Sequence, residues 1–99
     1  MIRVSGPALA AFGVPNPMSD PSLKLYDSNQ NVIASNSGWG GSAALAEASN
    51  KVAAFPIQDL KSSDSAILVT LPVGAYTVQG ASLSGASGAL LLEVYQVPP

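Results

Sequence analysis

The sequence predicts an all-β protein, an antiparallel β-sandwich with one short helix near residues 42–53. Short segments in which apolar and polar residues alternate recur along the chain, as half-buried strands require. Nine glycines and eight prolines punctuate the chain, many of them between these segments, which favours tight turns. Only one segment, Ser42–Ala53, is helix-like, and it is rich in alanine. Many short strands and a single helix are typical of a sandwich of two packed sheets.

The expected strands follow one another in a simple order. Alternation defines most of them, and Gly-Pro pairs or clusters of Asp and Asn mark the turns between them. These strands are Met1–Ser5, Ser22–Tyr26, Val32–Ser35, Ser65–Leu71, Tyr76–Ala81 and Leu90–Val97.

The connection after the first strand is expected to be irregular. Residues 8–13 are long enough for a single helical turn, which we expect to turn Leu9 and Phe12 toward the core. Residues 14–21 carry three prolines. Because proline cannot donate to a sheet ladder, that stretch is expected to be a loop.

The segment Asp27–Asn31 is expected to be the turn of a β-hairpin. Asp and Asn side chains bond to their own backbone and tolerate left-handed conformations. The segment also has the D-x-N-x-N opening of a calcium loop, but Val32 and Gly38 occupy the positions that need Gly and Glu. A weak cation between Asp20 and Asp27, at one end of the sandwich, remains the candidate metal site.

Ser42–Ala53 is the one helix-like segment. It is rich in alanine, and the hydroxyl of Ser42 suits the N-cap position. Leu45, Ser49 and Val52 fall near one face. We therefore expect a short helix lying over a sheet edge, held there by packing.

The strongest strand signal is Ser65–Leu71. It is β-branched and almost wholly apolar, as a central strand covered on both faces should be. Pro72 then presets a bend, and Gly74 is expected to take a positive φ in the turn. Tyr76 begins the returning strand and is expected to anchor the core.

The composition of the chain argues against several classes of function. Ninety-nine residues, 47% hydrophobic and 10% charged, make one domain over residues 1–99. Four scattered basic residues and a net charge of -2 argue against nucleic-acid binding. No apolar run approaches the roughly 20 residues that span a bilayer, so no membrane insertion is expected. Neither histidine nor cysteine is present, and no Gly-x-Ser-x-Gly motif occurs, which favours a protein that is not an enzyme and has no cofactor.

Trp39 lies in the glycine-rich stretch SNSGWGGS. Two interpretations remain open at this point. The ring is a structural anchor, packed where flanking glycines let the backbone fold tightly beside it. The alternative is a stacking platform for a surface glycan, with Tyr26 as a second ring.

Five stretches, which together cover nearly the whole chain, carry a resemblance to a known family. They are IRVSGPALAAFGV (2–14), DPSLKLYDSNQNVIASNSGWG (20–40), AAFPI (53–57), DSAILVTLPVGAYTVQ (64–79) and SGASGALLLEVYQV (84–97). In this order they resemble a repeat-like module of large exported bacterial surface proteins. The hairpin and L-P-x-G-x-Y-T-V portions are also similar to the jelly-roll domains of the prepeptidase C-terminal type.

The resemblance implies a non-catalytic, jelly-roll-like module at the cell surface, with any export signal upstream. Two positions depart from it. Gln30 replaces the usual glycine of the hairpin turn, so Asn29 or Asn31 is expected to carry any positive φ. Ser37 replaces an acidic residue before the tryptophan. Modules of this kind also begin with further strands, so we expect this chain to lack them and to expose an open sheet edge.

Three functions therefore remain. The first is a structural or adhesive module of a secreted or cell-surface bacterial protein, which acts by display, spacing or assembly beside neighbouring domains. The second is a filament subunit, completed by strand exchange between copies, since open edges recruit strands. The third is an accessory domain that binds a carbohydrate or calcium through Trp39 or Asp27.

Overall fold

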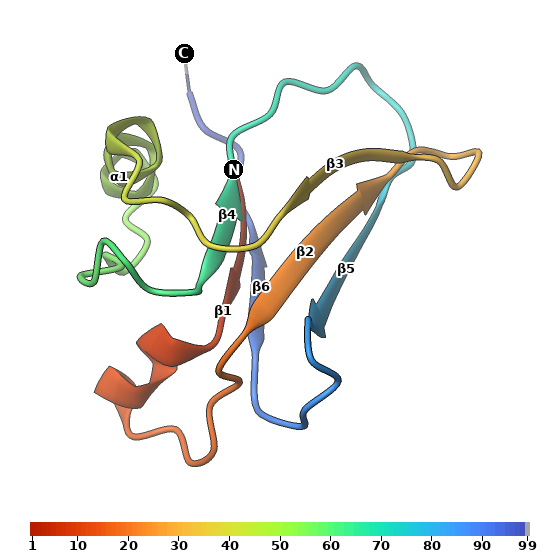
Figure 1. Ribbon diagram of the computed structural model, residues 1–99. Coiled ribbons are helices and arrows are strands. Elements are labelled where there is room, and N and C mark those ends of the chain that lie inside the picture. Colours follow the sequence, from red (N-terminus) through yellow and green to blue (C-terminus); the bar gives the residue numbers. More distant parts are fainter. Residues whose placement is uncertain (99) are drawn as a thin grey trace.

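The computed structural model describes residues 1–98 and contains two three-stranded antiparallel sheets with little helix (Figure 1). One sheet has the strand order β4-β1-β6, and the other has the order β3-β2-β5. A 3-10 helix, η1, and one α-helix, α1, lie outside the sheets. The elements are β1 (Ile2–Ser5), η1 (Pro7–Phe12), β2 (Pro21–Tyr26), β3 (Val32–Asn36), α1 (Ala43–Lys51), β4 (Ser65–Ile67), β5 (Thr77–Ser82) and β6 (Leu91–Val94).

The first strand, β1, is the centre of its sheet. It pairs with β4 on one side and with β6 on the other, and all four of its residues are buried. The prediction that Ser65–Leu71 is a central strand was wrong. Only residues 65–67 pair, as edge strand β4, because the chain then leaves this sheet and crosses to β5 of the other (Figure 1). Along the crossover Val69 and Leu71 pack against the core, while Leu68 is exposed.

The hairpin of β2 and β3 forms as expected, but its turn differs. Gln30 itself has a φ of 64°, so neither neighbouring asparagine carries the left-handed conformation. The carboxylate of Asp27 explains why the turn tolerates this residue. Its Oδ1 accepts hydrogen bonds from the backbone N–H groups of Asn29 and Asn31, at 2.9 and 3.0 Å.

The expected helix forms over Ala43–Lys51. Ser42 is its N-cap, and the Ser42 Oγ accepts a hydrogen bond from the N–H of Leu45. The helix places Leu45 and Ala48 on a small apolar cluster outside the two sheets. That cluster also contains Met1, Trp39, Ala54 and Ala66.

The main core lies between the two sheets. It consists of Ile2 and Val4 from β1 and of Leu23 and Leu25 from β2, all buried. Partly buried side chains surround these four, among them Ile67, Val78 and Leu90. The central strand of each sheet therefore supplies the part of the core that is closed to water.

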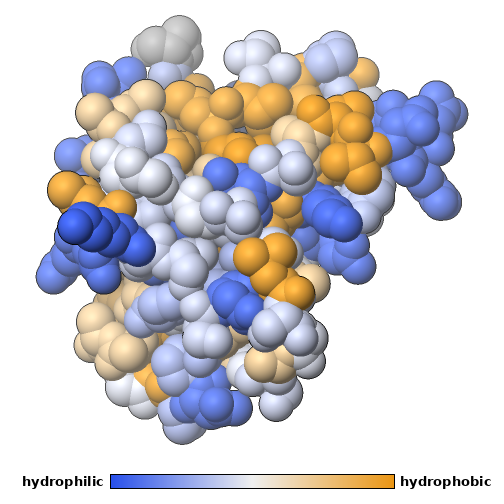
Figure 2. Space-filling model, in the orientation of Figure 1, coloured by the Kyte–Doolittle hydropathy of each residue, from blue (hydrophilic) through white to orange (hydrophobic). Residues whose placement is uncertain are grey.

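The surface carries scattered apolar side chains. Leu68 and Val73, in the connection between β4 and β5, are exposed, and Figure 2 shows apolar residues gathered in the upper part of the view. Among residues 1–98, no helix has both the length and the apolar character needed to cross a bilayer.

Candidate functional site

Trp39 occupies the position of a core side chain. Only 6% of its surface is exposed, and it packs in the cluster beside α1. Its indole Nε1 donates a 3.1 Å hydrogen bond to the carbonyl of Asp59. The three glycines around it all have positive φ, which lets the loop fold over the ring. Stacking on a sugar needs an exposed ring face, which this packing does not leave.

Tyr26 does not lie beside Trp39. Its hydroxyl, at the end of β2, is 3.1 Å from the Oε1 of Gln79 on β5. Tyr26 lines an open hollow with Gln30 and Gln79, whereas Trp39 lines a separate cavity of about 140 Å³ beside Arg3. The two rings therefore do not form one stacking site.

Asp20 and Asp27 are also separated. They flank the six residues of β2, one at each end, and are therefore roughly 20 Å apart. The hydroxyl of Ser82, together with Ser84, donates hydrogen bonds to Asp20 and lowers the pKa of that carboxyl. The expectation that the two aspartates share a cation is wrong. Within residues 1–98, no group of three or more acidic side chains is arranged to hold a metal ion.

Of the other three expected anchors, Tyr76, Gly74 and Phe12, only Tyr76 packs against the main core. Tyr76 is half-buried against the main core, and its hydroxyl donates a 2.6 Å hydrogen bond to the carbonyl of Pro72. Gly74 does not have a positive φ, so the expected glycine turn is not formed there. Phe12 is 61% exposed because η1 turns it outward, where its ring meets Phe55 edge-on at 4.9 Å.

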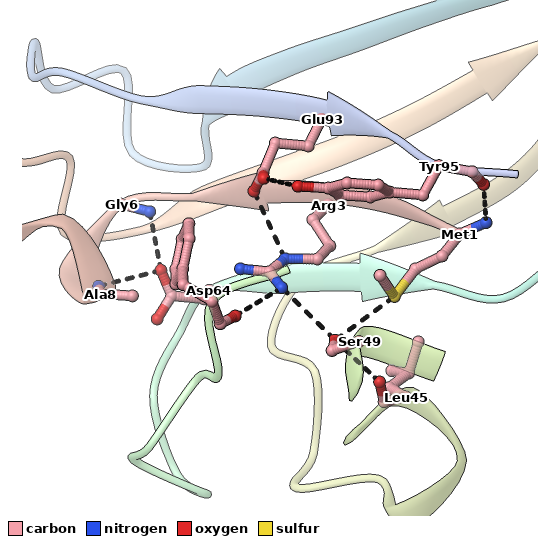
Figure 3. A network of polar contacts seen from close by, with 10 residues as sticks. Met1, Arg3, Gly6, Ala8, Leu45, Ser49, Asp64, Glu93 and Tyr95 are labelled. Atoms are coloured by element: carbon pink, nitrogen blue, oxygen red, sulfur yellow. Dashed lines mark hydrogen bonds and ion pairs between the residues drawn. The ribbon is translucent and has the colours of Figure 1, made fainter. Parts of the chain in front are cut away.

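A buried network around Arg3 was not anticipated (Figure 3). The Arg3 side chain is fully buried, with its Nε 3.5 Å from Oε1 of Glu93 on β6. Its Nη1 donates a 2.8 Å hydrogen bond to the carbonyl of Phe55, and its guanidinium carbon lies 4.2 Å from the Phe55 ring centroid. Tyr95 donates to the other oxygen of Glu93, and this bond raises the pKa of the Tyr95 phenol. Alternation along β1 puts Arg3 on the face opposite Ile2 and Val4, and Phe55 covers it there.

The carboxylate of Asp64 is buried in the same region. Its Oδ1 accepts hydrogen bonds from the N–H groups of Gly6 and Ala8, at 2.7 and 3.1 Å (Figure 3). The hydroxyl of Ser62 donates to Oδ2. These bonds hold the start of η1 against Asp64, the residue just before β4. Both oxygens are engaged by the chain itself, so this buried acid has a structural explanation.

The feature without such an explanation is the side of the molecule formed by β5 and β6, here called the open side. On β6, Leu92 and Val94 stand opposite Val4 and Ile2 of β1. Opposite residues of paired strands point to the same face, which here is the main core. Val4 and Ile2 are 0% and 4% exposed, but Leu92 and Val94 are 37% and 64% exposed. Core-facing side chains on β6 thus remain in contact with water.

The second sheet ends at the same side. Gly80 of β5 faces the first sheet, and a Cβ placed on it would lie 3.1 Å from Val4 and 3.5 Å from Leu90. On the opposite side of the core, β4 contacts β2 and β3. The outer edges of β5 and β6 therefore border the same flank of the core, one edge from each sheet.

The backbone of β6 is also available at this edge. Met1 and Tyr95 exchange two hydrogen bonds of 2.8 Å, so Tyr95 directs its N–H and C=O toward β1. In an antiparallel pair this direction alternates from one residue to the next. Leu92 and Val94 therefore direct their N–H and C=O groups outward, where a further strand would bind.

Comparison of this chain with protein-family models, with curated proteins and with solved structures finds no match in any of the three.

Proposed function

We propose that this chain is a non-catalytic structural module that works by assembly, through the addition of β-strands to its open side. The observation that carries the proposal is the exposure of Leu92 and Val94, which face the core while their partners on β1 are buried. An edge strand with free backbone groups and apolar, core-facing side chains is the surface to which another strand adds. The resemblance to exported bacterial modules supports placing this assembly at the cell surface.

The strand order supports a jelly-roll-like sandwich that is short of two strands. In an eight-stranded jelly roll, the first strand lies beside the eighth and the second beside the seventh. Counting β1 to β6 as the third to eighth strands accounts for the two observed sheet orders. The two vacant positions then fall beside β6 and β5, the two edges that border the open side.

Charge supports the same proposal. Natural edge strands are commonly guarded by lysine, proline or inward-pointing charges. β5 (TVQGAS) has no charged residue, and the only charge on β6 (LLEV) belongs to Glu93, which is engaged by Arg3 and Tyr95. Nothing in either strand discourages the approach of another strand.

The test examines the open side in dilute solution, where single chains predominate. We expect the amide hydrogens of Leu92 and Val94 to exchange rapidly with solvent and that of Arg3 to exchange slowly. We also expect the apolar dye ANS to bind, and Val94→Lys to reduce that binding. Val73→Lys, at an exposed apolar position in a loop, is the matched control and should not reduce binding as much.

Amides at Leu92 and Val94 protected as strongly as that of Arg3, with no binding of ANS, would mean that the chain closes its own open side. The proposed function would then fail.

A further inference from the structure

We propose that the strand added to β6 is β6 of a second copy of this chain, related to the first by a two-fold axis. This inference rests on the proposed function and names the partner at the open side. The two β6 strands would run antiparallel and would extend β4-β1-β6 into one six-stranded sheet across the interface. The same axis would bring the β5 edges of both copies to that interface.

The backbone groups on the edge fit such a contact. Leu92 and Val94 both direct N–H and C=O groups outward, as derived from the Met1–Tyr95 pair. When the two-fold axis passes beside Leu92, this residue exchanges both hydrogen bonds with Leu92 of the second copy. Val94 then stands opposite Leu90 of the second copy, so donors and acceptors meet at every second residue.

The side chains select this register among its neighbours. With Leu92 at the axis, every side chain directed to the core along the seam is leucine or valine. Moving the axis to Glu93 would place two carboxylates directly opposite each other, which is destabilising. Moving it to Val94 would place the polar Gln96 opposite Leu92. Of these three registers, only the Leu92-centred one keeps the seam apolar, and it leaves each Glu93 opposite Leu91.

The open side of one copy is complementary to the open side of a second copy. On each open side, Leu92 and Val94 have no apolar side chains packed over them, and a second copy would supply its own leucine and valine side chains there. The edge of β6 carries no unpaired charge that would oppose this contact. A standard interface takes about 800 Å² from each partner, and the chain exposes 5799 Å². One flank of a molecule measuring 36 × 30 × 19 Å is of that order. An isologous contact of this kind closes on itself, so growth stops at two copies.

The absence of cysteine makes the register directly testable, because each introduced thiol is unique. In the Leu92→Cys variant, the two thiols face each other across a hydrogen-bonded pair, with Cα atoms about 5.5 Å apart. That separation suits a disulfide. We therefore expect mild oxidation to produce a covalent dimer, seen on a gel without reductant.

Two variants serve as matched controls. In Val94→Cys the two thiols would be offset by four residues along the seam, roughly 13 Å, and should not bridge. A mixture of Val94→Cys with Leu90→Cys should bridge, since these positions are opposite each other in the expected register. Val73→Cys places a fully exposed thiol on a loop and measures bridging by random collision.

Light scattering of the unaltered chain provides a second measurement that needs no variant to fold. We expect the mass to rise with concentration from 10.0 kDa to twice that value and then to remain constant. Val94→Lys should hold the mass at one chain, because a charge would be buried in the seam.

Three results would overturn the inference. Equal bridging by Leu92→Cys, Val94→Cys and Val73→Cys would show that the contact has no defined register. Growth beyond two copies would indicate an open-ended filament instead of a closed pair. A mass of one chain at every concentration, with rapid exchange and ANS binding retained, would reject the second copy and leave the proposed function standing, with a strand of another protein segment as the occupant.

Discussion

The two flanks of the core differ in how the chain treats its sheet edges. At the flank of β3 and β4, the chain caps its own edge: the N–H of Ala66 donates a 2.9 Å hydrogen bond to the side chain of Asn36. The hydroxyl of Ser65 accepts from the N–H of Gly38 and donates to the carbonyl of Pro21. At the flank of β5 and β6, no comparable cap covers Leu92 or Val94 in the part of the chain that the structure describes. The difference shows that this edge is closed by side chains at the end of β3 and the start of β4.

The largest expected effect compares two leucines that both face the core. Leu25→Ala should lower the free energy of unfolding by about 2–5 kcal/mol, because Leu25 is fully buried on central strand β2. Leu92→Ala should cost on the order of 1 kcal/mol in the single chain, because much of its surface already contacts water. Urea denaturation in dilute solution measures both values. Similar costs at the two positions would contradict the distinction between a closed and an open flank.

The second prediction concerns removal of the Asn36 side chain that caps the edge of β4. Asn36→Ala should cost about 1–3 kcal/mol, because it leaves the N–H of Ala66 without an acceptor in a partly buried position. Exchange of the Ala66 amide hydrogen should become faster. Asn36→Asp retains an acceptor oxygen and should keep that amide protected. Unchanged exchange in Asn36→Ala would mean that another group closes this edge.

The smallest expected effect concerns the outer face of β6 and depends on pH. Tyr95 donates to the carboxylate of Glu93, which raises the pKa of the Tyr95 phenol above its ordinary value of 10.0. The protonated phenol therefore stabilises the fold below about pH 10, and this contribution disappears as pH rises through the folded-state pKa. Tyr95→Phe should lose less stability than the unaltered chain on going from neutral to strongly alkaline pH.

Thermal unfolding across this pH range is the measurement. Tyr26→Phe, on the other sheet, is the matched control because the Tyr26 hydroxyl lies against the neutral amide of Gln79. Tyr95→Phe should reduce the alkaline loss more than Tyr26→Phe does. An equal loss in Tyr95→Phe would assign the alkaline destabilisation to other groups.

Local signals predicted some elements well. The helix formed where alanine content and the Ser42 cap placed it, and the hairpin formed between two alternating segments. Both depend on contacts between residues close in the chain. The turn itself was harder to predict, because Gln30 adopts a positive φ only with the help of two bonds to Asp27.

Predictions that depended on distant contacts were less successful. The apolar run Ser65–Leu71 has the composition of a central strand, but only its first three residues pair. Arg3 is the one charged residue of its strand. It is nevertheless buried, because Phe55 and Glu93, both more than fifty positions away in the sequence, pack against it. Nothing near Arg3 in the sequence indicates either partner.

The sequence by itself determined that this protein is rich in short antiparallel strands, with one capped helix and few charges. These properties follow from side-chain periodicity, turn chemistry and composition, which act over a few residues. Only the tertiary structure decided which strands are central, that Trp39 packs inside, and that β5 and β6 form the open side. Strand order and burial depend on which distant segments meet, and the alternation of Leu92 and Val94 is the same whether or not another strand covers them.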